Sequence, residues 1–154
     1  LTEHGIGSYE ELVERCDAVS AASIRTRESL RDTEQRITDL ALLGKKIDTY
    51  RKLKPVYDRY KASNDKEKFL RGFESEIILF EAAAREIKKA GLTKLPSSDK
   101  LKAELDGLSA CKTYLKAELH KIKEEEKRYD NLRQNVDVLL EQTKEIQINS
   151  YEIE

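Results

Sequence analysis

The chain has 154 residues, of which 38% are charged and 38% are hydrophobic, and its formal net charge is −1. Because an average globular domain has about 25% charged residues, this chain can bury only narrow apolar stripes along helices, not a thick core. Two prolines and six glycines leave few helix interruptions, and no apolar run approaches the roughly 20 residues that cross a membrane. We therefore expect one cytoplasmic, all-α domain over residues 1–154, with no membrane partner.

The first predicted helix spans about residues 8–52. Ser8 and Glu11 have the spacing of a capping box at a helix N-terminus. Apolar residues at three-and-four spacing then form one stripe along the helix. Between residues 20 and 33 this stripe carries small polar side chains, which predicts a bend or a poorly packed stretch there.

Pro55 decides where the first helix ends. A proline removes one backbone donor and disfavours helical geometry at the preceding residue, here Lys54. Two alternatives stay open: the helix ends near Lys52, or it kinks there and continues to about residue 61.

The second predicted helix spans about residues 65–89. Asn64 and Asp65 are both good N-caps, and Gly91 is suited to the position just beyond the helix C-terminus. The centre, Ile77–Phe80 followed by three alanines, is the most apolar part of the chain and is wide enough to contact two partners. We expect this short helix to be the central one.

The third predicted helix spans about residues 98–146. Its apolar residues recur every seven positions, which is typical of a coiled coil, although Glu118 and Glu125 interrupt the companion stripe. The fold prediction is thus an all-α, elongated three-helix bundle or coiled coil with two long helices and a shorter, apolar central helix. Part of the long helices is a candidate homodimer interface.

Positive charge is concentrated in one segment. Residues 1–44 carry a net charge of −4, whereas residues 45–71 carry +6 and three tyrosines. Basic residues interleaved with aromatics could bind a nucleic-acid backbone; alternatively, they form a solvated helical face whose tyrosines pack inward. The ten residues of this candidate DNA-binding patch are Lys45, Lys46, Arg51, Lys52, Lys54, Arg59, Lys61, Lys66, Lys68 and Arg71.

Residues that could perform catalysis are not grouped in this sequence. His4 and His120 are far apart and lack the spacing of metal ligands, and no glycine-rich phosphate loop is present. We therefore predict no catalytic residues, no metal site and no cofactor. Cys16 and Cys111 both fall on apolar stripes, which favours small buried side chains over a redox pair.

Several segments, in this order, resemble the C-terminal region of relaxases (mobilisation nucleases) from plasmids and integrative conjugative elements of bacteria. The resemblance covers most of the chain. The matching segments are Leu-Thr-Glu-His-Gly-Ile at 1–6, Ser-Tyr-Glu-Glu-Leu at 8–12, Lys-Pro-Val-Tyr at 54–57, Lys-Glu-Lys-Phe at 66–69, Glu-Ser-Glu-Ile-Ile-Leu-Phe-Glu-Ala-Ala at 74–83, Gly-Leu-Thr-Lys-Leu-Pro at 91–96 and Asn-Val-Asp-Val-Leu-Leu at 135–140.

The resemblance implies a function in conjugative DNA mobilisation. Relaxases nick DNA with a tyrosine beside a metal ion, but that chemistry belongs to an N-terminal domain that this sequence lacks, so no catalytic residue is carried over. The absence of methionine likewise suggests an excised fragment. We expect a non-catalytic accessory domain that binds a relaxosome component or the coupling protein. The alternatives are an auxiliary DNA-binding module using residues 45–71, or a structural coiled-coil spacer.

Overall fold

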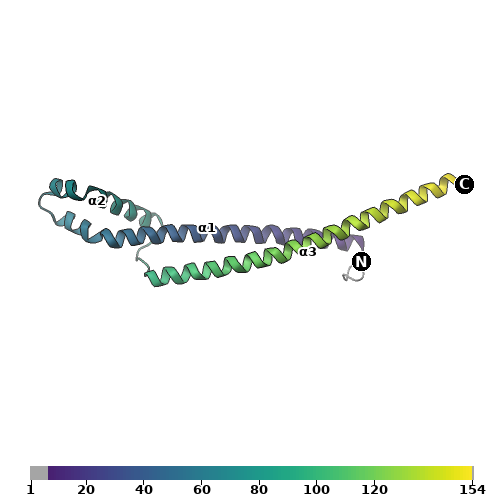
Figure 1. Cartoon of the computed structure of the whole chain (residues 1–154), viewed down its shortest axis with the longest axis horizontal. Helices are drawn as coiled ribbons and strands as arrows, with labels where there is room; N and C mark the ends of the chain where they lie inside the picture. The colour runs from purple at the N-terminus through teal and green to yellow at the C-terminus, as the bar shows by residue number, and fades with distance from the viewer. Residues whose placement is uncertain (1–6, 154) are drawn as a thin grey trace. The chain divides into compact units, whose positions relative to one another are not determined.

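The computed structural model describes residues 7–153, and over these residues the fold is all-α, as the sequence predicts. Three helices follow one another along the chain (Figure 1). They are α1 (Tyr9–Ala62), α2 (Lys66–Lys89) and α3 (Ser98–Ile153). The segment 1–6, which includes His4 and the first stretch of the relaxase resemblance, lies outside the described residues.

Helix α1 begins at a capped N-terminus and continues through Pro55. The Ser8 hydroxyl accepts a hydrogen bond from the Glu11 amide at 3.1 Å, and the Glu11 carboxylate accepts one from the Gly7 amide at 2.9 Å. Of the two alternatives left open at Pro55, the structure has the continuous one, since the helix ends only at Ala62.

Helix α2 is capped at both ends by residues of the expected kind. The Asp65 carboxylate accepts a hydrogen bond from the Lys68 amide at 3.1 Å. Gly91 follows the helix with φ of +73°, the left-handed region that glycine enters without steric cost. Within the helix, Phe73 departs from helical geometry, with φ of −134° and ψ of 25°.

Helix α3 is longer than the sequence predicts. The Ser97 hydroxyl caps it by accepting a hydrogen bond from the Lys100 amide at 3.2 Å. The helix then continues past the expected end at Ile146 to Ile153.

The chain divides into two compact units. Unit 1 comprises the chain up to Asp32 together with the chain from Lys112 onward, and unit 2 is Thr33–Cys111. The division on α1 falls at the end of the segment 20–33, where the sequence pattern is least apolar. Helix α1 is continuous there, so no break in the helix accompanies the weak stripe.

The core of unit 1 is a seam between α1 and α3. Leu12 and Cys16 of α1 are buried and pack against three half-buried residues of α3, namely Tyr129, Leu132 and Val136. The seam becomes polar farther along α1: the Ser20 hydroxyl donates to Glu126 at 3.2 Å, and the buried Ser23 hydroxyl has no hydrogen-bond partner among the described residues.

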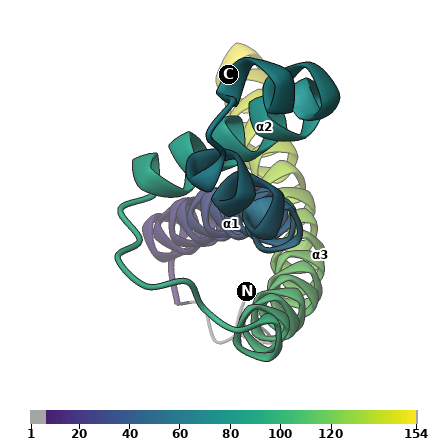
Figure 2. The ribbon, with the colours of Figure 1, turned by 90° about the vertical axis from the view of Figure 1, so that its left-hand side faces the viewer.

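The core of unit 2 joins all three helices. Buried Ile47, Ile87 and Leu101, one from each helix, form its centre. Figure 2 shows α1 between α2 and the beginning of α3, so α1 occupies the central place that the sequence analysis assigned to the second helix. The broad apolar face of α2 is covered on one side only, because Ile78 and Leu79 are each 55% exposed.

None of the helices, over the described residues, combines the length and hydropathy that a bilayer-spanning segment requires.

Candidate functional site

The candidate DNA-binding patch lies in unit 2, along the end of α1, the following turn and the first turns of α2. All ten of its basic side chains are exposed. Three of them, Lys45, Lys52 and Arg59, are spaced by seven residues on a continuous helix and so lie along one side of α1. The predicted positive charge is thus spread over residues 45–62 of α1 and residues 66–71 of α2.

The tyrosines of this segment pack against α2. Tyr57 and Tyr50 both stack on the buried Phe80, with ring centroids 4.3 and 4.7 Å away. Tyr60 lies 6.1 Å from Phe69, which in turn stacks on Phe73 at 4.8 Å. These aromatic rings serve as packing groups between α1 and α2, as the inward-packing interpretation of the tyrosines expects. Nucleic-acid bases would have to stack on rings that already have neighbours.

Half of the basic residues also have partners in the chain. The Lys54 ammonium pairs with Asp58 at 3.2 Å, and the guanidinium of Arg59 lies 5.7 Å from the ring centres of both Phe69 and Phe73. The others are Lys61 over the Tyr57 ring, Arg51 donating to the Pro96 carbonyl oxygen, and Arg71 donating to the Glu67 carbonyl oxygen.

The side-chain ammonium groups of the remaining five basic residues have no ion pair, hydrogen bond or ring contact with the described residues. Their ammonium groups face solvent and could bind phosphates without breaking an internal contact. They are Lys45, Lys46, Lys52, Lys66 and Lys68.

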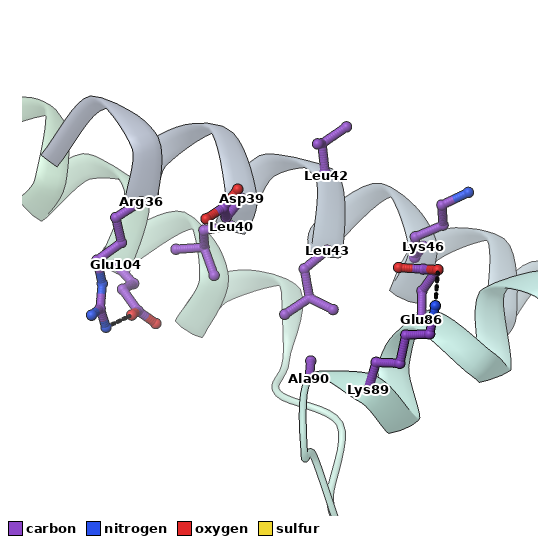
Figure 3. Close-up of a pocket in the computed structure, with 10 residues that line it drawn as sticks. All are labelled: Arg36, Asp39, Leu40, Leu42, Leu43, Lys46, Glu86, Lys89, Ala90 and Glu104. Carbon is purple, nitrogen blue, oxygen red and sulfur yellow. Dashed lines mark hydrogen bonds and ion pairs between the residues drawn. The ribbon is translucent and has the colours of Figure 1, made fainter. Parts of the chain in front are cut away.

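A hollow of about 520 Å³ lies between α1, the end of α2 and the beginning of α3 (Figure 3). Leu40 and Leu43 point into it from α1, and Ala90 faces them from the end of α2. Leu42 lies beside the hollow and is 53% exposed. This arrangement gives the hollow an apolar floor in a strongly charged chain.

Charged pairs border the hollow. Arg36 of α1 pairs with Glu104 of α3 at 3.4 Å, and Lys89 pairs with Glu86 within α2 at 3.5 Å (Figure 3). Both pairs are largely exposed and so contribute little to stability. An apolar floor with a charged border suits an apolar side chain or helix of another molecule.

Sequence reasoning missed this hollow. Its existence depends on where the connection between α2 and α3 lies next to α1: a second hollow of about 530 Å³ is lined by Leu40 and Leu43 together with Leu92, Leu95 and Pro96 of this connection. The three apolar residues of that connection were the available signal, because an exposed loop carries few such residues.

Large apolar side chains are also exposed in unit 1, on the last turns of α3. Leu139 is 62% exposed and Ile146 is 69% exposed. Both belong to the seven-residue pattern from which the sequence analysis predicted a coiled coil. That pattern extends beyond Val136, the last α3 residue in the apolar cluster of unit 1.

The residues considered for redox or metal chemistry are dispersed. Cys16 is buried, as expected, but Cys111 is exposed, so the expectation of a second buried thiol is wrong. The next residues on its stripe are Glu118 and Glu125, which leave Cys111 without an apolar seam to join. His120 is exposed, and no group of three potential metal ligands occurs among residues 7–153.

Comparison with protein-family models, with curated proteins and with solved structures finds no match to this chain.

Proposed function

We propose that this chain is a non-catalytic accessory domain of a bacterial DNA relaxase and that it binds a protein partner in the cytoplasm during conjugative DNA mobilisation. The relaxase assignment is supported by the ordered sequence segments described above. The partner is a relaxosome component or the coupling protein that brings the relaxase to the secretion channel.

The interaction role is supported by one observation in unit 2. Leu42, which is 53% exposed, lies beside the hollow whose floor is formed by Leu40, Leu43 and Ala90. Isolated exposed leucines are common, but an exposed leucine beside an apolar hollow with a charged border is typical of a protein-binding surface. An amphipathic helix of the partner could place its apolar side chains in this hollow.

The proposal also includes the arrangement of the three helices. An elongated three-helix bundle or coiled coil would hold the binding surface away from the catalytic domain of the relaxase. The apolar cluster of each unit supports this arrangement, because each one joins α1 to α3. Small-angle X-ray scattering of the chain would test it, and a compact, near-spherical particle would contradict it.

The test of partner binding is a titration of the chain with the purified coupling protein of the same conjugative element. Leu42→Lys should weaken binding at least tenfold, because it places a charge beside the apolar floor. Ala103→Lys introduces the same charge at an exposed position of α3 that does not line the hollow and should bind like the wild type. Equal binding by all three proteins would contradict the proposal that the partner binds at this hollow.

An auxiliary DNA-binding role is the second candidate, and the exposure of all ten basic residues favours it. The five lysines without internal partners are the ones to change, because their neutralisation leaves the packing between α1 and α2 intact. Each phosphate contact contributes about 0.9 to the slope of log affinity against log salt concentration on duplex DNA. The first variant therefore carries Gln at Lys45, Lys46, Lys52, Lys66 and Lys68.

A matched control has the same change in net charge elsewhere. It carries Gln at five exposed lysines of α3, namely Lys100, Lys102, Lys116, Lys123 and Lys127. Salt-dependent DNA binding that is lost in the first variant and kept in the control would support the DNA-binding role. Loss in both would indicate nonspecific attraction. A chain that binds neither DNA nor the coupling protein would leave a structural spacer as the remaining interpretation.

A further inference from the structure

The apolar seam between α1 and α3 continues along α3 beyond the beginning of α1. In unit 1 the two helices run antiparallel, and the seam there includes Leu132 and Val136. The same four-and-three spacing continues through the last turns of α3, where helix α1 is no longer alongside. We call this continuation the C-terminal seam; it consists of Leu139, Thr143, Ile146 and Ser150.

The C-terminal seam alternates aliphatic and hydroxyl-bearing residues, and all four are exposed. Leu139 and Ile146 are 62% and 69% exposed, respectively. The Thr143 hydroxyl donates to the Leu139 carbonyl oxygen at 2.9 Å within the helix. Burying Thr143 against another helix would therefore leave no unpaired donor, which removes the usual cost of a threonine in such a seam.

The charges near this seam lie on the opposite side of the helix. Residues 137–152 contain four acidic residues and one basic residue, a net charge of −3. At 100° per residue all five fall on the outer side of α3, and the positions that flank the seam hold uncharged residues. These flanking residues are Asn135, Leu140, Gln142, Gln147 and Asn149.

This charge pattern selects among the classes of partner. A net negative segment is repelled by anionic lipid and by nucleic-acid phosphates. A second copy of the same helix meets only weak repulsion, because the like charges of both copies would lie away from the contact and salt screens charges so far apart. The pattern therefore suits self-association.

We propose that the C-terminal seam pairs with the C-terminal seam of a second copy of this chain, with the two α3 helices antiparallel. In this arrangement the partner's helix takes the place beside α3 that α1 occupies in the rest of unit 1. Leu139 faces Ser150 of the partner subunit, and Thr143 faces Ile146 of the partner subunit. Each layer of the antiparallel contact then holds one aliphatic and one hydroxyl-bearing side chain, whereas a parallel, in-register pair would alternate layers of two aliphatic side chains with layers of two hydroxyl-bearing ones.

The contact is short, and its strength follows from its length. Residues 137–152 of α3 extend over about 24 Å at about 1.5 Å per residue, which places the dimer among small, weak interfaces. The pairing does not depend on the relaxase assignment, since it follows from α3 alone. We expect a reversible dimer with a dissociation constant on the order of 10–100 µM.

Sedimentation velocity over a range of concentrations tests the pairing, with circular dichroism to verify that helix content is unchanged. The wild type should shift from monomer to dimer, and Ile146→Lys should weaken dimerisation at least tenfold. Ile148→Lys is the matched control, because Ile148 is 57% exposed and lies off the seam. A wild-type chain that stays monomeric at several hundred micromolar, or equal effects of the two variants, would overturn the proposal.

Disulfide cross-linking tests the direction of the pairing in a Cys111→Ser background, which removes the exposed thiol. A mixture of Leu139→Cys and Ser150→Cys chains should form the mixed disulfide under mild oxidation. Preferential linking of Leu139→Cys chains to each other would indicate parallel helices and overturn the antiparallel arrangement. In the antiparallel pair those two positions are about 16 Å apart along the axis, well beyond disulfide reach.

Discussion

Tyr57 of α1 stacks on Phe80 of α2, with ring centroids 4.3 Å apart and ring planes at 24°. Tyr50 stacks on the same phenylalanine at 4.7 Å. Phe80 is buried, and it contacts two aromatic rings of α1. Stacked pairs of this kind contribute beyond the burial of their area, so Phe80 is a principal attachment of α2 to α1.

Phe80→Ala should lower the free energy of unfolding by about 3–5 kcal/mol, because it removes a buried aromatic ring and leaves a cavity. The neighbouring Leu79→Ala is the matched control: Leu79 is 55% exposed, and its truncation should cost less than about 1 kcal/mol. Urea unfolding followed by circular dichroism measures both. Similar losses in the two variants would contradict the packing of Phe80 between α1 and α2.

Replacement of Ser23 by alanine should stabilise the protein. Its side chain is buried, and its hydroxyl oxygen lacks a hydrogen-bond partner among the described residues. Ser23→Ala removes an unsatisfied polar group and introduces the best helix former, so stability should rise by about 1 kcal/mol. Ser75→Ala, at an exposed position of α2, should gain only the helix-propensity part, about 0.5 kcal/mol. A destabilised Ser23→Ala protein would mean that the hydroxyl has a partner, such as a buried water.

Substitution by alanine should change the stability of the protein in opposite directions at Gly44 and at Gly91. Gly44 lies inside α1 with open space where a Cβ would stand, so Gly44→Ala should stabilise the protein by about 0.5–1 kcal/mol. Gly91 also has space for a Cβ, but its φ of +73° is unfavourable for alanine, and Gly91→Ala should destabilise by about 1 kcal/mol. Thermal unfolding of both variants gives the signs, and a gain at Gly91 would contradict the left-handed turn after α2.

The helix ends with capping residues were the most predictable part of this fold, unlike the C-terminal ends of α1 and α3. Ser8, Asp65 and Gly91 each carry local chemistry that acts on the adjacent backbone, so neighbouring residues suffice to locate the ends they mark. The course of α1 through Pro55 was left open, because the answer depends on Tyr57 and Tyr60 packing against phenylalanines of α2. Such contacts are distant in sequence and have no local signature.

The candidate sites were predictable to different degrees. Composition alone located the basic segment, since exposed lysines need no particular neighbours. The sequence did not distinguish a base-stacking surface from an internal contact, because interleaved tyrosines fit both equally well. In the structure, Tyr50 and Tyr57 pack against Phe80. The hollow at Leu40 and Leu43 requires the path of the connection between α2 and α3, which periodicity does not encode.

Pro55→Ala should stabilise the protein. Pro55 is exposed within α1, so it contributes little packing while it costs a backbone hydrogen bond and a clash with the preceding turn, together about 3 kcal/mol. Proline also restricts the unfolded chain, which returns about 1 kcal/mol of that cost. A net gain of about 1–2 kcal/mol in urea unfolding is expected, and a loss would indicate that α1 is bent at Pro55 in a way its contacts require.

The two cysteines should differ in reactivity. Cys111 is exposed and should react with a thiol reagent in the folded protein. Burial raises the pKa of the Cys16 thiol above its ordinary value of 9.0, which keeps it protonated as well as covered. Cys16 should therefore react only when the structure around it opens, and much more slowly than Cys111, as labelling in a Cys111→Ser variant would measure.

The raised pKa of Cys16 also fixes the sign of a pH effect. Well below pH 9 the thiol is protonated in the folded and unfolded chains, so there it adds no pH dependence to stability. As the pH rises toward 9 and beyond, the unfolded chain loses this proton first, so the free energy of unfolding should fall. Cys16→Ala should show a shallower fall between pH 8.5 and about pH 10 than the wild type. Identical slopes would mean that Cys16 ionises as readily in the folded chain as in the unfolded one.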